Sequence, residues 1–83
     1  MSIIVLYFAS LRETLGVERE ELALPAQVVD IAGLRTWLLT RGDRWAALAA
    51  PRIRAAVNQT LAGETAGIAD GDEVAFFPPV TGG

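Results

Sequence analysis

The sequence predicts an α+β domain in which a helix covers one face of a small mixed sheet of about five strands. Three observations support this class. Short apolar segments of strand-like composition lie near both ends of the chain. Between them lies a longer segment whose apolar residues recur at helical spacing. The length of 83 residues suits one domain that is large enough to fold without disulfides or metals.

The N-terminal part is expected to form two strands joined by a brief helix. Residues 2–9, SIIVLYFA, are apolar at successive positions and therefore predict a strand that is central in the sheet. Ser10 and Glu13 fit a capping box that opens a helix, and Gly16 closes it. Residues 17–25, VEREELALP, predict a second strand whose acidic residues suit a solvated face.

The main helix is expected to begin after Asp30, a suitable N-cap, and to end at Gly42. Gly33 weakens such a helix by about 1 kcal/mol relative to alanine, so packing must hold it. A short helical turn over residues 43–48 follows. The predicted buried side of the main helix comprises Ile31, Leu34, Trp37 and Leu38.

The C-terminal part is expected to complete the sheet. Residues 53–60, IRAAVNQT, and a short piece around Leu61 are interpreted as paired strands. Asp70-Gly71-Asp72 is interpreted as a tight turn, with glycine supplying the positive φ. It leads into the last strand, residues 73–77. Because that strand can lie parallel to the first in the sheet centre, the β-grasp topology is the natural candidate.

Composition excludes several classes of function. There is no cysteine and no histidine, which removes thiol nucleophiles, the usual zinc ligands and the side chain best suited to proton transfer near neutral pH. The net charge of −3 without a basic cluster argues against a nucleic-acid partner. All seven cationic residues are arginine, so Schiff-base chemistry is also absent. The hydrophobic fraction of 52% suggests that some apolar side chains stay exposed for a partner.

Acidic and aromatic residues offer few catalytic candidates. Glu20 and Glu21 are neighbours in a strand and point to opposite faces, so we expect a solvated strand surface rather than a catalytic pair. Asp70-Gly71-Asp72 lacks the further oxygen ligands of a calcium loop. Trp37 and Trp45 are interpreted as core or shielding residues, with an interface role as the alternative.

The apolar run over residues 3–9 is far too short to span a membrane and has no basic residue before it. It is therefore interpreted as a strand and not as a signal peptide. We expect a cytoplasmic protein without a membrane partner.

The chain ends in FFPPVTGG, which divides it into a domain over residues 1–77 and an extended tail over residues 78–83. Val74 and Phe76 are expected to face the helix, and Phe77 to face away from it. Two prolines hold the exit stiff, and six residues beyond Phe77 reach roughly 20 Å. A narrow tail of this length could enter the active site of another protein. A frayed end is the alternative.

Five segments of the chain resemble the small, sulfur-carrying subunits of molybdopterin synthase, which belong to the ubiquitin-like sulfur carriers. The segments are VLYFASLRETLG, LRTWL, DRW, AAVNQTL and DGDEVAFFPPVTGG. The resemblance covers nearly the whole length. A terminal Gly-Gly alone is weak evidence, because other ubiquitin-like and thiazole-forming carriers share it. The combination of AVNQT with DGDEVAFFPPVTGG is specific.

This resemblance implies a β-grasp fold and a chemistry at the α-carboxylate of Gly83. In that family an ATP-using enzyme similar to ubiquitin-activating enzymes adenylates the terminal glycine, which a sulfur donor enzyme converts to a thiocarboxylate. The carrier then donates sulfur to cyclic pyranopterin monophosphate inside the large synthase subunit, in a complex of two small and two large subunits. The chain itself would bind no cofactor and would not be an enzyme on its own. The residues implied in tail insertion are Pro78, Pro79, Val80, Thr81 and Gly82.

The partner interface is predicted on the sheet face opposite the helix. Phe8, Leu61 and Phe77 are the candidates for this exposed patch, and burial in the core is the alternative. Two other functions remain open from the residues. One is a sulfur carrier for thiazole synthesis or tRNA thiolation, and the other is an interaction domain with an inert tail.

Overall fold

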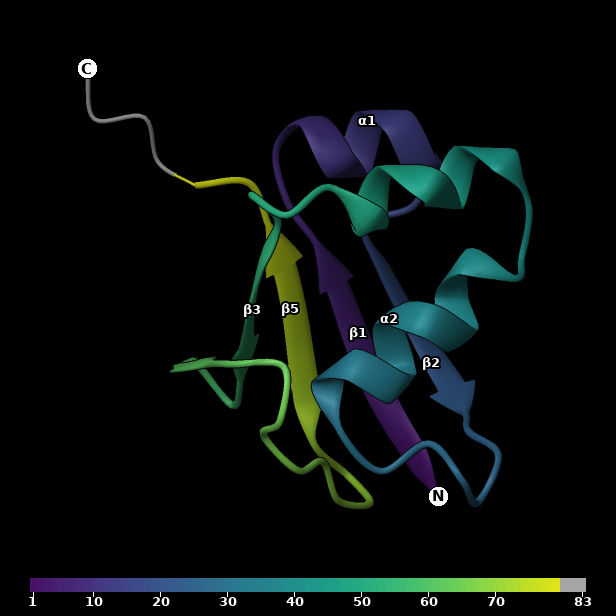
Figure 1. Ribbon diagram of the computed structural model, residues 1–83, viewed down its shortest axis with the longest axis vertical. Coiled ribbons are helices and arrows are strands. Elements are labelled where there is room, and N and C mark those ends of the chain that lie inside the picture. Colours follow the sequence, from purple (N-terminus) through teal and green to yellow (C-terminus); the bar gives the residue numbers. More distant parts are fainter. Residues whose placement is uncertain (80–83) are drawn as a thin grey trace.

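The computed structural model describes residues 1–79, which form a five-stranded sheet in the order β2-β1-β5-β3-β4. Helix α2 lies across one face of this sheet (Figure 1). The strands are β1 (Ser2–Tyr7), β2 (Arg19–Ala23), β3 (Arg54–Val57), β4 (Thr60–Ala62) and β5 (Glu73–Phe77). The helices are α1 (Ser10–Leu15), α2 (Ile31–Leu39) and the 3-10 helix η1 (Asp43–Ala49).

The first and last strands form the parallel centre of the sheet. Strand β1 pairs with β5 in parallel, with Val5 beside Val74 and Tyr7 beside Phe76. Strand β2 is antiparallel to β1, β3 is antiparallel to β5, and β4 is antiparallel to β3. This arrangement confirms the predicted β-grasp topology.

Alternation along the central strands separates a buried face from an open one. Val74 and Phe76 are fully buried, as predicted, and Phe77, the last residue of β5, is only half-buried. Beneath α2 the core is continuous with the buried side of η1, where Trp45 lies. The fully or nearly fully buried residues from β1 and α2 are Ile3, Val5, Tyr7, Ile31, Leu34 and Leu38. Trp37 is partly buried against this core.

The capping box predicted for α1 is wrong. The cap position is Ala9, with φ of 54°, and Ser10 is the first helical residue. No side chain bonds to the free amides at this end of α1. The chain leaves β1 through Ala9, whose φ is positive, and the helix starts one residue earlier than the sequence pattern indicates. At the other end, Gly16 closes the helix as predicted, with φ of 74° and its N–H donating to the carbonyl of Arg12.

Helix α2 begins as predicted but ends before the expected residue. The Oδ1 atom of Asp30 accepts a hydrogen bond from the amide of Gly33 at 2.7 Å. The helix stops at Leu39 and not at Gly42. The hydroxyl of Thr40 donates to the carbonyl of Trp37 at 2.6 Å and the amide of Thr40 bonds to the same carbonyl, which tightens the last turn and ends the helix.

The turn before β5 agrees with its prediction. Gly71 has φ of 86°, a conformation that glycine adopts without a steric penalty. Both neighbouring carboxylates stabilise the turn: Asp70 accepts from the amide of Ser2 at 2.7 Å, and Asp72 accepts from the amide of Ala69 at 2.8 Å.

Candidate functional site

The sheet face opposite α2 carries a row of apolar side chains. Leu6 lies beside Ala75 in the parallel pair, and Ala75 lies beside Ala56 in the neighbouring antiparallel pair. Ala56 in turn lies beside Leu61 of β4. The row therefore crosses β1, β5, β3 and β4. Because alternate residues of these strands point into the core, the row points away from it.

Phe8 and Phe77 extend this row at the end of the sheet where the tail begins. The amide of Phe8 donates to the carbonyl of Phe76 at 3.2 Å, which continues the parallel register and places Phe8 beside Phe77. Phe8 is 46% exposed and Leu61 is 64% exposed, while Phe77 is half-buried. We call the six residues Leu6, Phe8, Ala56, Leu61, Ala75 and Phe77 the apolar sheet face.

Sequence reasoning found three of these six residues and missed Leu6, Ala56 and Ala75. Alternation within each strand indicates which residues share a face, but the pairing register decides which of them become neighbours. The parity of the first and last strands, once a parallel pairing is assumed, indicates Leu6 and Ala75. Ala56 lies in β3 and needs the register of β3 with β5 as well.

The tail starts where the pairing of β5 ends. Phe77 is the last residue of β5, and its neighbour across the antiparallel ladder is Arg54. Pro78 and Pro79 follow and are half-buried. A proline has no amide proton to donate, so the ladder cannot continue through them. The predicted tail residues Val80, Thr81 and Gly82, and the predicted reactive residue Gly83, lie outside the described residues.

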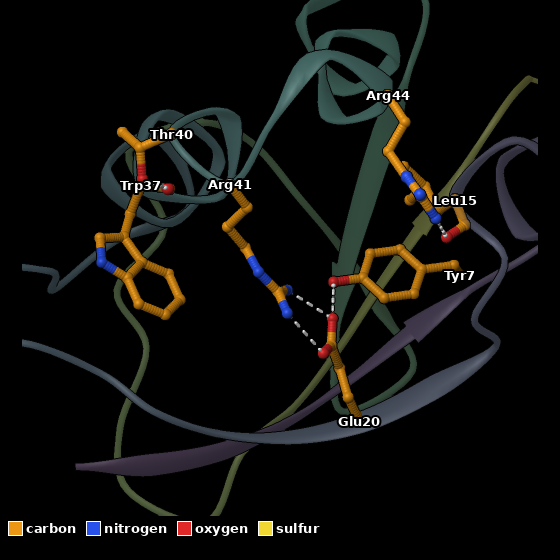
Figure 2. Close-up of polar contacts among 7 residues, drawn as sticks. All are labelled: Tyr7, Leu15, Glu20, Trp37, Thr40, Arg41 and Arg44. Carbon is orange, nitrogen blue, oxygen red and sulfur yellow. Dashed lines mark hydrogen bonds and ion pairs between the residues drawn. The ribbon is translucent and has the colours of Figure 1, made fainter.

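A polar cluster lies on the helix side of the sheet, where Glu20 is the β2 neighbour of the buried Val5. Figure 2 shows its hydrogen bonds. The hydroxyl of Tyr7 donates to the carboxylate of Glu20 at 2.8 Å. The guanidinium of Arg41 donates to both oxygens of that carboxylate, at 2.7 and 3.0 Å. The same guanidinium lies 4.3 Å from the ring centre of Trp45. The expectation of a solvated surface is therefore wrong for Glu20 and correct for Glu21, which is exposed.

Both acidic groups of this cluster are held in one protonation state. Burial, together with the hydrogen bond to Glu20, raises the pKa of Tyr7 far above its ordinary value. Burial alone would raise the pKa of Glu20, but the hydrogen bonds from Arg41 and Tyr7 lower it below the ordinary value. Neither group is free to exchange a proton near neutral pH. The cluster therefore clamps the segment that follows α2 to the sheet and does not act as an acid–base pair.

A second arginine braces the segment that leads into β3. The guanidinium of Arg35 donates to the carbonyls of Leu48 and Ile53, at 2.6 and 3.1 Å. It forms an ion pair with Glu64 at 2.8 Å and lies 5.4 Å from the ring centre of Phe76. A groove of about 420 Å³ opens beside it and borders the apolar sheet face at Leu61.

Residues 1–79 contain neither a metal-binding cluster of side chains nor a membrane-spanning helix. Within that range, no group of three or more acidic residues is close enough together to hold a metal ion. No helix of the described part is long and apolar enough to cross a membrane.

The chain is similar to proteins of a known family. The model of the ThiS family matches residues 5–83. The molybdopterin synthase sulfur carrier subunit of Escherichia coli K12 is 49% identical over 80 residues, covering 95% of this chain and 96% of that protein. The subunit of the same name from Haemophilus influenzae Rd is 42% identical, with the same coverage of both chains.

The fold comparison agrees with the sequence comparison. The crystal structure of SAMP1 from Haloferax volcanii matches with a TM-score of 0.77 and 25% identity over the full length of both chains. The resemblance to sulfur-carrier subunits that the sequence motifs indicated is confirmed. This chain belongs to the ThiS family.

Proposed function

We propose that this chain is the sulfur carrier subunit of a molybdopterin synthase and acts in molybdenum cofactor biosynthesis. The observation that carries this proposal is the 49% identity to the Escherichia coli subunit of that name, which extends over nearly all of both chains. The apolar sheet face supports it, because an exposed apolar surface beside the root of a narrow tail suits a protein that docks and then delivers the end of its chain.

The reactive group in this proposal is the α-carboxylate of Gly83. A carboxylate is a poor acyl donor, so exchange of oxygen for sulfur needs prior activation. Attack of the carboxylate on ATP gives a mixed anhydride with AMP and releases pyrophosphate. Hydrosulfide, released by a separate donor enzyme, then attacks the acyl carbon, displaces AMP and leaves a thiocarboxylate and a proton. Glycine suits positions 82 and 83 because a Cβ atom would widen a tail that must enter a narrow channel.

The catalytic groups for these steps are assigned to partner proteins. The chain has no cysteine, histidine or lysine. In the polar cluster, the carboxylate of Glu20 is already bonded to Tyr7 and Arg41. We infer that an adenylating enzyme activates the carrier and that the large synthase subunit catalyses sulfur transfer to cyclic pyranopterin monophosphate. Two small and two large subunits form the proposed complex. We place this chemistry in the cytoplasm, where ATP is available to the activating enzyme.

The apolar sheet face is the proposed docking surface for both partners. Phe8 and Phe77 lie at the root of the tail, and Leu61 lies at the β4 edge, so a partner that covers all three also fixes the direction in which the tail leaves. The nearest cationic residue before the tail is Arg54. The thiocarboxylate and the phosphate-bearing pterin are both anionic, so the large subunit must supply the neutralising cations.

Intact-mass measurement tests the carrier function directly. Incubation with the activating enzyme, ATP and a sulfur donor should shift the mass by the exchange of one oxygen for one sulfur. A chain without Gly83 should show no shift. The thiocarboxylated chain should yield molybdopterin from the precursor only after the large subunit is added. Conversion of the precursor by the isolated chain at a comparable rate would contradict the proposal.

A carrier for thiazole synthesis is the second candidate, because the matching family model is the ThiS family. Both candidates predict the same mass shift, and the acceptor distinguishes them. We expect the thiocarboxylated chain to support molybdopterin formation with a large synthase subunit and not thiazole formation with a thiazole synthase. The opposite result would favour the second candidate.

A further inference from the structure

The turn that joins β3 to β4 has an unusual backbone. It consists of two residues, Asn58 and Gln59, between the paired residues Val57 and Thr60. Both turn residues have positive φ, 50° and 69°, and neither is glycine. This geometry matches the twist of a tight hairpin, but only asparagine and a few other residues tolerate it well. Strain of this kind persists where the surrounding structure holds it in place.

The side chain of Asn58 holds the turn against the start of β5. Its Oδ1 atom accepts the amide of Glu73 at 3.0 Å, and its Nδ2 atom donates to a carboxylate oxygen of Asp72 at 3.0 Å. The backbone amide of Asn58 donates to the carbonyl of Glu73 at 2.8 Å. The side-chain oxygen thus takes the place of a backbone acceptor at the point where β3 turns away from β5.

Asparagine combines three properties at this position. It tolerates the left-handed conformation, it offers an acceptor to a backbone amide, and it offers a donor to a carboxylate. Aspartate would keep the first two and place a negative charge against Asp72. Glycine would keep only the first. The other oxygen of Asp72 accepts the amide of Ala69, so the carboxylate that anchors Asn58 is itself held in place.

The position of Leu61 depends on this turn. Strand β4 has three residues and lies at the edge of the sheet, where β3 is its neighbouring strand. Leu61 is 64% exposed, so contacts with the core do little to fix it. The hairpin pairs and the turn therefore set where its side chain lies. Hydrogen bonds of Asn58 tie this turn to Glu73 of β5, the strand that carries Ala75 and Phe77.

We propose that Asn58 is a positioning residue for partner docking, which holds Leu61 at a fixed place relative to Phe77 and so presents the apolar sheet face in its bound arrangement. This inference rests on the proposed function, because it takes the large synthase subunit as the partner. A surface that is ordered before binding loses less conformational entropy on association. Within residues 1–79 the side chain of Asn58 bonds to Asp72 and Glu73, at the end of β5 remote from the tail, so we expect its effect on docking and not on the chemical step.

The central variant is Asn58→Gly, which keeps the backbone conformation accessible and removes both side-chain hydrogen bonds. We expect affinity for the large subunit to fall about tenfold, mainly through faster dissociation. The turnover of sulfur transfer at saturating large subunit should stay unchanged. Asn58→Asp should also weaken binding, and its loss of affinity relative to the native chain at the same salt concentration should shrink as added salt screens the repulsion from Asp72.

Two controls separate positioning from a general loss of stability. Asp30→Ala removes the cap of α2, a single hydrogen bond on the helix side of the sheet, and should leave affinity unchanged although it destabilises the fold. Gln59→Gly relieves the second positive φ and leaves the Asn58 bonds intact, so affinity should also be retained. Hydrogen exchange of the Thr60–Ala62 amides should accelerate in Asn58→Gly and not in Asp30→Ala.

A double-mutant cycle with Leu61→Ala gives the decisive readout. If Asn58 acts through Leu61, Asn58→Gly should cost about tenfold in the native background and little once Leu61 is truncated. An equal loss in both backgrounds, or an equal loss for Asp30→Ala, would overturn the positioning role. Native affinity for Leu61→Ala would overturn both this role and the docking surface. The sulfur-carrier function would fail separately, through the absence of a mass shift in the activation assay.

Discussion

Removing the carboxylate of Glu20 should destabilise the fold more than an exposed glutamate would. Glu20→Ala leaves the hydroxyl of Tyr7 buried without its acceptor, which costs about 1–2 kcal/mol. The lost contact with Arg41 adds about 0.5 kcal/mol, a small amount because that side chain is 32% exposed and solvent screens it. The free energy of unfolding should therefore fall by about 2 kcal/mol. For a domain of this size the melting temperature should fall by roughly 10 °C.

Tyr7 and Glu20 should also be energetically coupled. Tyr7→Phe removes the hydroxyl, and Glu20 keeps Arg41 as a partner, so this change should cost about 1 kcal/mol. In the Tyr7→Phe background, Glu20→Ala should cost only about 0.5 kcal/mol, because no hydroxyl is left without an acceptor. Urea unfolding of all four proteins at neutral pH measures the cycle. An equal cost of Glu20→Ala in both backgrounds would refute the assignment of most of the loss to the buried hydroxyl.

Four further predictions concern pH, docking, the tail and salt. The folded chain holds the pKa of Tyr7 above its ordinary 10.0. The stability that this group contributes is therefore complete below pH 10.0 and is lost as the pH rises above it. The free energy of unfolding should fall above pH 10.0, and it should fall less in Tyr7→Phe. Phe77→Ala should weaken association with the large subunit more than it lowers the melting temperature, whereas unchanged binding with reduced stability would assign Phe77 to the core. Deletion of Gly83, or a bulky residue in place of Gly82, should abolish sulfur transfer with almost no change in melting temperature, and a marked fall would show the tail to be structural. Titration calorimetry at increasing salt should show weaker association with the large subunit, with a salt-resistant remainder from the apolar contacts; affinity independent of salt would remove the electrostatic part of the docking model.

Local patterns were sufficient to predict the sheet and the start of its main helix. Alternation in residues 73–77 correctly placed Val74 and Phe76 in the core, because period-two burial needs no knowledge of the partner strand. Asp30 was identifiable as a cap because its hydrogen bond reaches only three residues along the chain. Predictions of this kind succeed where the interaction that decides the structure is close in sequence.

The predictions that were wrong or incomplete mostly concern features that local sequence patterns do not decide. The sequence predicts a solvated surface for Glu20 because its partners, Tyr7 and Arg41, lie 13 and 21 residues away and leave no local signal. The end of α2 was placed at Gly42 because glycine is the commonest stop signal, whereas the hydroxyl of Thr40 ended the helix earlier. The full extent of the apolar sheet face needed the strand register, which only the folded chain supplies.

The central pairing of β1 with β5 also bears on how the protein is made. Its two strands are far apart in the sequence, with Ile4 beside Glu73, so a ribosome must synthesise the whole segment between them before the pair can form. Such distant contacts make folding slow and late. A chain interrupted before β5 lacks Val74 and Phe76 and cannot close its core. The strand that completes the fold, β5, is also the strand that leads into the tail. A chain that terminates before β5 should therefore stay unfolded and be degraded. It should not survive as a folded, tailless chain that competes for the partner.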